Sequence, residues 1–156
     1  MITGGNISAA SGDDGMHASG NLTISDGTVD ITKSYEGIEG SIVTIDGGTI
    51  SVVSSDDGIN CAGGSDTGST DRMGADQFSA QEGVELNING GTVTIDADGD
   101  GLDSNGSFTM AGGTVYVCGP TNGGNGALDY NGTATVTGGT LIACGVVGME
   151  EGGGGG

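Results

Sequence analysis

The sequence predicts an all-β protein, a right-handed single-stranded parallel β-helix in which about five coils form a three-sided solenoid. A turn followed by threonine recurs with a period of 21 to 22 residues, with one interval of two periods and a longer last one. Each period contains three short segments in which apolar and polar residues alternate, and such alternation indicates strands with one buried face. Coils stacked about 4.8 Å apart bury a continuous apolar column, which a single coil cannot do. The turns are Asp26-Gly27-Thr28, Gly47-Gly48-Thr49, Gly90-Gly91-Thr92, Gly112-Gly113-Thr114 and Gly138-Gly139-Thr140.

The three strands of each coil are expected at corresponding positions of the period. The first strand is predicted at 16–18, 38–40, 59–61, 102–104 and 128–130. The second is predicted at 22–24, 43–45, 86–88, 108–110 and 134–136, and the third, after the turn, at 29–31, 50–52, 93–95, 115–117 and 141–143. Cys61, Phe108 and Tyr130 fall at inward positions, so we expect them in the core.

The solenoid is expected to span residues 1–149, followed by an acidic and glycine-rich tail or linker at 150–156. A long loop is inserted at 62–83, and it is either a ligand-contacting loop or a passive insertion. The chain opens in mid-repeat, which suggests that Met1 is not the native start and that a leader or further repeats are missing from this chain.

The charge balance is strongly acidic. The chain has 21 Asp and Glu residues against two basic residues, Lys33 and Arg72, and a net charge of −19. A chain with so few cations cannot hold a phosphate backbone, which excludes nucleic acid as a partner. No apolar run reaches about eighteen residues, so membrane insertion is not expected. Bound cations would offset the repulsion that this charge creates.

The acidic residues recur in phase with the coils. An acidic residue, a glycine and an aliphatic residue begin four of the coils, so stacking places Asp14, Glu36, Asp57 and Asp100 in one column. Neighbouring columns hold first Asp13 and Asp56, and then His17, Glu39, Asn60, Asp103 and Asp129. Carboxylates this close repel one another when bare, and two interpretations remain open, a solvated acidic edge and a row of cation sites.

Calcium is the cation that the pattern favours. The segment Asp96-Ala97-Asp98-Gly99-Asp100-Gly101 matches the first half of an EF-hand loop, but Ser107 stands where that loop needs its bidentate glutamate. The segment is therefore a calcium turn of another kind, completed by Asp57 or Asp103. Magnesium demands tighter octahedral geometry, and zinc is disfavoured by a single histidine and unclustered thiols.

Two cysteines occupy equivalent positions of successive repeats. Stacking would bring Cys118 and Cys144 within bridging range, and both the bridged and the free form remain open.

The repeat resembles a known family. The run from Gly12 to Ile24, GDDGMHASGNLTI, is similar to the D-D-G-I-H-A-x-G-x-L-x-I repeat of bacterial carbohydrate-binding β-helix proteins related in fold to polysaccharide lyases, and segments 55–60 and 98–106 resemble later repeats. The resemblance covers about residues 2–149 and implies a secreted or surface protein with bound Ca²⁺ that binds cellulose or acidic sugars. Glu36 and the pair Asn125-Gly126 depart from its acidic pattern. By position it implies calcium ligands at Asp13, Asp14, Asp56, Asp57, Asp98 and Asp100.

The function expected from the sequence is therefore that of a secreted, calcium-binding, non-catalytic carbohydrate-binding or extracellular-matrix protein. Its metal ligands are expected among Asp13, Asp14, Glu36, Asp56, Asp57, Asp98, Asp100 and Asp103. Tyr35 and Tyr116 are the outward aromatic residues expected to contact a polysaccharide, either cellulose or a uronate-rich glycan. One alternative is a structural subunit that stacks end to end into an extracellular fibre. A second is a calcium-dependent polysaccharide lyase, although Lys33 and Arg72 are the only candidates for its basic residue.

Overall fold

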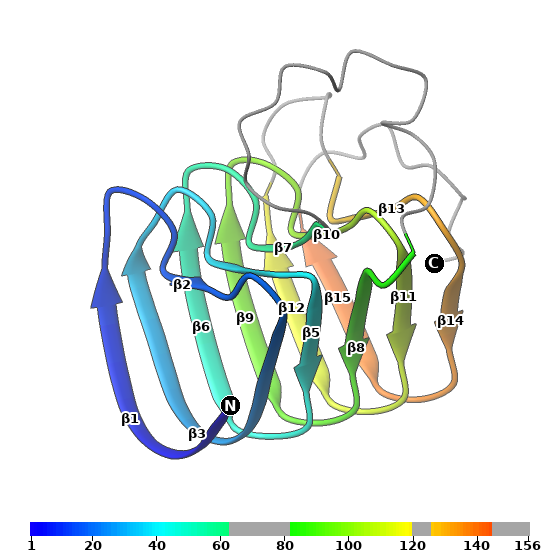
Figure 1. Cartoon of the computed structure of the whole chain (residues 1–156), viewed down its shortest axis with the longest axis horizontal. Helices are drawn as coiled ribbons and strands as arrows, with labels where there is room; N and C mark the ends of the chain where they lie inside the picture. Colours follow the sequence, from blue (N-terminus) through cyan, green and yellow to red (C-terminus); the bar gives the residue numbers. More distant parts are fainter. Residues whose placement is uncertain (63–81, 120–125, 145–156) are drawn as a thin grey trace.

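The computed structural model describes residues 1–62, 82–119 and 126–144, which form strands and turns without a helix (Figure 1). Parallel strands stack into a β-solenoid of about five turns, which confirms the predicted fold. No helix in these residues is long and apolar enough to span a membrane. Most of the predicted insertion, 63–81, and the tail, 150–156, lie outside the described residues.

Each coil contributes one strand to each of three faces, and neighbouring strands on a face pair in parallel (Figure 1). Face A contains β2 (Met16–His17), β4 (Ile38–Gly40), β7 (Ile59–Cys61), β10 (Leu102–Ser104) and β13 (Leu128–Tyr130). Face B contains the first part of β3 (Asn21–Lys33), then β5 (Ile42–Ile45), β8 (Glu85–Ile88), β11 (Ser107–Met110) and β14 (Ala134–Val136). Face C contains β1 (Ile2–Ala10), the second part of β3, β6 (Thr49–Ser54), β9 (Thr92–Ala97), β12 (Thr114–Cys118) and β15 (Thr140–Cys144).

We number the coils by their strands. Coil 1 is β2–β3, coil 2 is β4–β6, coil 3 is β7–β9, coil 4 is β10–β12 and coil 5 is β13–β15, while β1 pairs with β3 outside coil 1. Thirteen of the fifteen predicted segments match a strand to within two residues at each end, and the other two, 22–24 and 29–31, lie within the one continuous strand β3.

The turn between faces B and C depends on glycine. The predicted threonine column is in register, since Thr28 pairs with Thr49, Thr49 with Thr92, Thr92 with Thr114 and Thr114 with Thr140. The glycine before each threonine has a positive φ, for example +103° at Gly27 and +91° at Gly48. Residues other than glycine rarely adopt this backbone conformation. The position of glycine in the sequence therefore determines where each coil bends.

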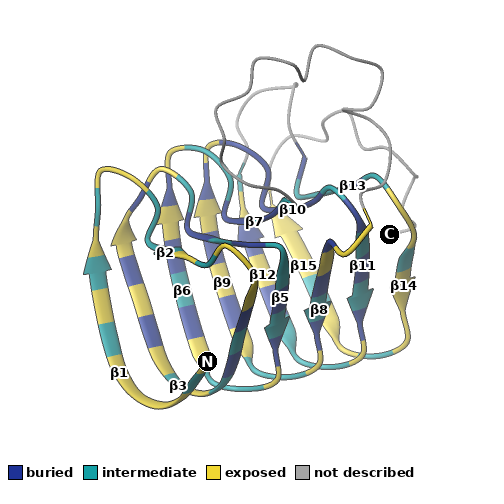
Figure 2. Cartoon of the chain, in the orientation of Figure 1, coloured by how far each residue is buried: buried dark blue, intermediate teal, exposed yellow. Residues whose placement is uncertain are grey.

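In most strands buried residues alternate with more exposed ones (Figure 2), and the buried residues form one apolar column. Ile24, Ile45 and Ile88 are completely buried, and burial of such a side chain stabilises the fold by about 1.5–3 kcal/mol. The predictions of inward positions for Cys61, Phe108 and Tyr130 are confirmed, because their exposed fractions are 0%, 0% and 8%. Burial raises the pKa of the Cys61 thiol to about 12.

Coil 5 is less covered than the coils before it. Val136 faces inward on β14 in register with the buried Met110, yet 60% of its surface is exposed. Ala143, in register with the buried Val117, is also exposed. The described residues thus pack against coil 5 from one side only.

Candidate functional site

The corner that leads into face A carries the predicted acidic column. The amide of Gly15 donates to the carbonyl oxygen of Glu36 at 2.9 Å, and that of Gly37 donates to Asp57 at 3.0 Å. The amide of Gly58 donates to Asp100 at 2.9 Å in the same way. Neighbouring coils therefore stack their acidic residues directly, and we call Asp14, Glu36, Asp57 and Asp100 the acidic column.

Close packing explains why glycine follows each acid. A Cβ atom on Gly58 would lie 2.6 Å from the carbonyl oxygen of Gly101 in the next coil, and one on Gly15 would lie 2.7 Å from that of Gly37. Neither distance is possible without displacing the backbone. In coil 5, after which no further coil is described, the position holds Ala127. The stacking distance itself thus keeps bare backbone beside the acidic column.

A second row of polar side chains runs along face A, as predicted. Strand pairing aligns His17 with Glu39, Glu39 with Asn60, Asn60 with Asp103, and Asp103 with Asp129. We call these five residues the outer column. It runs beside the acidic column, so that a carboxylate of one column can meet a carboxylate of the other.

Three carboxylates of coils 3 and 4 converge between the two columns. Asp57, Asp100 and Asp103 each place an oxygen within 4.8 Å of the other two. Backbone groups orient two of them, because the amide of Asp100 donates to Oδ1 of Asp57 at 2.8 Å and the amide of Gly126 donates to Oδ1 of Asp100 at 2.7 Å. We call these three residues the aspartate cluster.

The environment of the aspartate cluster opposes ionisation. Burial is the largest cause in every case, and repulsion from neighbouring carboxylates adds to it, while the backbone hydrogen bonds act in the opposite direction at Asp57 and Asp100. The pKa is raised to about 7 for Asp57, about 6 for Asp100 and about 9 for Asp103. Desolvated carboxylates that face one another gain more from a shared cation than solvated ones do.

Glu36 and Asn60 extend this environment toward coil 2. Nδ2 of Asn60 donates to Oε1 of Glu36 at 3.0 Å, and burial raises the pKa of Glu36 to about 7 despite this bond. Oδ1 of Asn60 is buried and accepts no hydrogen bond from the described part of the chain. Buried acceptors are almost always satisfied, so this oxygen, on the strand next to Asp103, fits a neighbouring cation.

The donor set fits calcium better than other common metals. Carboxylate and amide oxygens are hard ligands, and Ca²⁺ accepts six to eight of them in flexible geometry. The cluster contains no thiol or imidazole, the ligands typical of zinc. Asp57, Asp100 and Asp103 would hold the ion, with Asn60 nearby.

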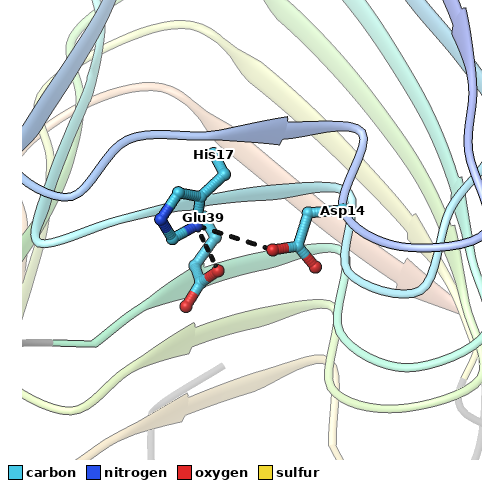
Figure 3. A group of neighbouring side chains, drawn as sticks. All are labelled: Asp14, His17 and Glu39. Carbon is cyan, nitrogen blue, oxygen red and sulfur yellow. Dashed lines mark hydrogen bonds and ion pairs between the residues drawn. The ribbon is translucent and has the colours of Figure 1, made fainter. Parts of the chain in front are cut away.

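A second group of possible ligands lies in coils 1 and 2 (Figure 3). Nδ1 of His17 is 2.6 Å from Oε2 of Glu39 and 3.5 Å from Oδ2 of Asp14. Burial raises the pKa of Glu39, the hydrogen bond with Asp14 adds to the increase, and His17 acts against it. His17 is the only basic side chain on the described strands of face A, so in its protonated form it would supply countercharge to this end of the two columns.

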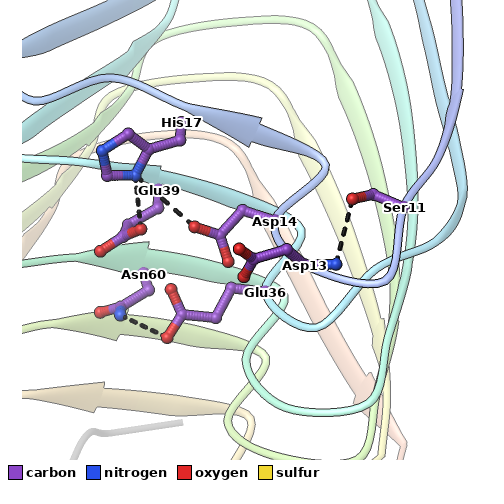
Figure 4. Close-up of polar contacts among 7 residues, drawn as sticks. All are labelled: Ser11, Asp13, Asp14, His17, Glu36, Glu39 and Asn60. Carbon is purple, nitrogen blue, oxygen red and sulfur yellow. Dashed lines mark hydrogen bonds and ion pairs between the residues drawn. The ribbon is translucent and has the colours of Figure 1, made fainter.

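The remaining predicted ligands lie outside both groups. Asp13 is exposed beside Asp14, and its amide donates a hydrogen bond of 3.0 Å to Oγ of Ser11 (Figure 4). Asp56 approaches the aspartate cluster, because a Cβ atom on Gly99 would lie 2.6 Å from Oδ1 of both Asp56 and Asp57. Asp98 is exposed and belongs to neither group of converging ligands.

The two tyrosines predicted to contact a glycan are both exposed, Tyr35 by 49% and Tyr116 by 41%. Tyr35 lies at the corner before face A, where a hydrogen bond with Asp56 raises the pKa of its hydroxyl. Tyr116 lies on face C, between Thr94 and Ile142 on the adjacent strands. They belong to different parts of the solenoid, so they offer two separate aromatic surfaces.

Three residues of the site were not among the predicted ligands. His17 and Glu39 form a group with Asp14, and Asn60 contributes the buried oxygen beside Asp103. Their position in the outer column could have identified them as possible ligands, since every member of that column faces the same side of the solenoid.

The fold and the site together define an acidic parallel β-solenoid with carboxylates that converge on one edge. Residues 1–77 match the model of a family described as "Carbohydrate-binding domain-containing protein". The matched part contains Asp14, His17, Glu39 and Asp57 but ends before Asp100 and Asp103. No curated protein and no solved structure matches the chain at a significant level.

Proposed function

We propose that this chain is a carbohydrate-binding β-solenoid without catalytic activity, and that it acts outside the cell with Ca²⁺ bound at the aspartate cluster. The observation that carries the calcium assignment is the convergence of Asp57, Asp100 and Asp103 from two coils, with oxygens within 4.8 Å of one another. The family match over residues 1–77 supports the carbohydrate partner.

The charge of the chain supports an indirect contact with acidic sugars. A net charge of −19 repels uronate carboxylates, whereas an ion held at the edge of face A would offer them a positive partner. Asp57 and Asp103 are only partly buried, so an ion between them would have one side open to solvent. Calcium accepts more ligands than the cluster supplies, and a sugar carboxylate or hydroxyl is a suitable addition.

The aromatic surface on face C supports a contact of another kind. Tyr116 is exposed next to Thr94 and Ile142, and a flat ring with hydroxyl and apolar neighbours suits the face of a neutral sugar. A neutral polymer such as cellulose would use this surface without calcium. Binding of acidic sugars at the aspartate cluster should therefore require Ca²⁺, whereas binding of a neutral polymer at the Tyr116 surface should not.

The placement of basic side chains among the described residues supports a binding role over a lyase. Proton abstraction next to a uronate carboxylate requires a base within reach of the substrate. Among the described residues Lys33 is the only lysine or arginine, and it lies at the end of β3, outside the aspartate cluster. Histidine also stands apart from the aspartate cluster, since His17 is in coil 1.

Thermal unfolding with and without Ca²⁺ tests the proposal. Protein stripped with a chelator should gain on the order of 5–10 °C in Tm when Ca²⁺ is added at about 100 times its Kd. Asp57→Asn should lose most of this gain, and the exposed Asp98→Asn should retain it. An equal gain in both variants would show that the ion binds elsewhere. No gain in the wild type would contradict the metal site and favour the other interpretation, a solvated acidic edge.

Retention on insoluble polysaccharides tests the sugar partner. Retention on a cross-linked polyuronate should disappear with the chelator, while retention on cellulose should not. Light scattering on the same samples reports whether coils of different molecules associate end to end. Failure to bind either polymer while the calcium response persists would leave a calcium-binding solenoid and remove the carbohydrate assignment.

A further inference from the structure

Two thiols lie side by side on face C, away from the acidic edge. Cys118 ends β12 and Cys144 ends β15, and strand pairing puts the two residues in register. Both are exposed and neither is bridged. Cys61, the other cysteine, is buried in the core, where its thiol is withheld from solvent reagents.

The backbone geometry suits a cross-link between these cysteines. In-register residues on adjacent parallel strands are separated by about 4.8 Å, and the Cα atoms of disulfide-bonded cysteines are usually about 4.4–6.8 Å apart. The amide of Gly119 donates to the carbonyl oxygen of Cys144 at 2.8 Å, which keeps the two strand ends together. Because both side chains point to the same side of the sheet, a movement of a few tenths of an ångström brings the Cβ atoms into bridging range.

Coil 5 is the part of the described solenoid that gains most from such a link. Its inward residues Val136 and Ala143 are exposed, so little buried apolar surface on its faces B and C opposes fraying. We propose that Cys118 and Cys144 form a disulfide between coils 4 and 5 on exposure to a disulfide oxidant, and that this bond holds coil 5 in register.

The reaction is an ordinary thiol–disulfide exchange. One cysteine thiolate attacks a sulfur of a low-molecular-weight disulfide such as glutathione disulfide, which forms a mixed disulfide and releases one glutathione thiolate. The second cysteine thiolate then attacks the protein sulfur of the mixed disulfide and releases the second glutathione. The protein loses two protons and two electrons, and the oxidant gains them to become two molecules of glutathione.

The bond would also fix a neighbouring surface. Tyr116 and Ile142 precede the two cysteines by two residues on the same strands and pair with each other. Cross-linking the strand ends therefore keeps the two exposed side chains adjacent, whatever they bind.

The test uses the intact protein and two matched variants. Reduced wild type incubated with glutathione disulfide should lose two hydrogens in mass, and a non-reducing peptide map should join Cys118 to Cys144 and leave Cys61 free. Cys118→Ser and Cys144→Ser should each take up one glutathione and form no internal bond. The bridged wild type should melt on the order of 5–10 °C above the reduced form, and neither variant should show this difference.

Two results would overturn the proposal. Wild type that carries two glutathiones, or that forms only cross-linked dimers, would show that the thiols do not reach each other. A Cys118–Cys144 bond that leaves Tm unchanged would show that it does not hold coil 5. The calcium response is measured separately and has no bearing on either result.

Discussion

The amide of Asp100 donates a hydrogen bond of 2.8 Å to Oδ1 of Asp57, which lies 43 residues earlier in the chain. This bond joins coils 3 and 4 at the point where the acidic column meets the aspartate cluster. It orients the Asp57 carboxylate through the backbone of the next coil, so the orientation is present before any ligand binds. A site built in this way spends little free energy on ordering its ligands.

Replacing one ionisable carboxyl of the aspartate cluster by an amide should stabilise the metal-free protein, because the folded protein then no longer has to protonate that group at neutral pH. Asp103→Asn keeps the shape of the side chain but removes a carboxyl whose pKa burial raises to about 9. Urea unfolding in chelator at pH 7.5 should show a free energy of unfolding higher by about 1–3 kcal/mol than in the wild type. The same variant should lose the gain in Tm on addition of Ca²⁺. A lower stability than the wild type in chelator would contradict the raised pKa of Asp103.

The stability of the metal-free protein should fall as the pH rises. The pKa values of Glu36, Asp57, Asp100 and Asp103 lie at about 7, 7, 6 and 9, above the values near 4 of unfolded carboxyls. The folded state therefore binds more protons between about pH 4 and pH 9, and the stability that these groups contribute is complete below pH 4 and lost through this range. Tm measured in chelator should decrease by several degrees from pH 5 to pH 8, and Ca²⁺ should remove most of the decrease. A Tm that rises over this range without calcium would be inconsistent with the raised values.

Tyr116 should matter for binding and not for folding. The ring is 41% exposed on face C, so Tyr116→Ala should leave Tm nearly unchanged. Loss of the stacking surface should weaken retention on cellulose about 5- to 10-fold, which corresponds to about 1–1.4 kcal/mol. Tyr116→Phe keeps the ring and serves as the matched control. Equal retention by Tyr116→Ala and the wild type would remove this surface from the proposal.

The glycine beside Asp57 should not tolerate a side chain. A Cβ atom on Gly58 would lie 2.6 Å from the carbonyl oxygen of Gly101, so Gly58→Ala should reduce the free energy of unfolding by about 1–3 kcal/mol. Gly20→Ala is the matched control, because no atom lies within 4 Å of the added Cβ there. Similar urea midpoints for the two variants would show that the coils can separate locally.

The fold could be predicted from the sequence because its two determinants are local. Alternation of apolar and polar residues sets which side chains face inward, and the turn before each threonine sets where the coil bends. Together these fix the register, and the pairing of Thr28 with Thr49 and of Cys118 with Cys144 follows from counting residues.

The convergence of side chains was harder to predict. Stacking identifies the members of a column, but the approach between columns depends on how the chain bends at the corner before face A. Asp96 lies on β9 and is exposed, Asp98 is also exposed, and only Asp100 of this evenly spaced acidic run joins the aspartate cluster. Its partners are Asp57 of the coil before and Asp103 of the next strand, which the sequence offered as alternatives and the structure brings together.

The glycine column has a consequence for how such a molecule can change in length. Coils 1 to 4 each present the same bare backbone to the next coil, so a whole coil duplicated or deleted among them would leave the spacing of the others unchanged. Carboxylates along the edge are then spaced about 4.8 Å apart, and their number increases with the number of coils. For a polymeric ligand, a longer row of carboxylates increases the valency of binding while the individual contacts stay the same.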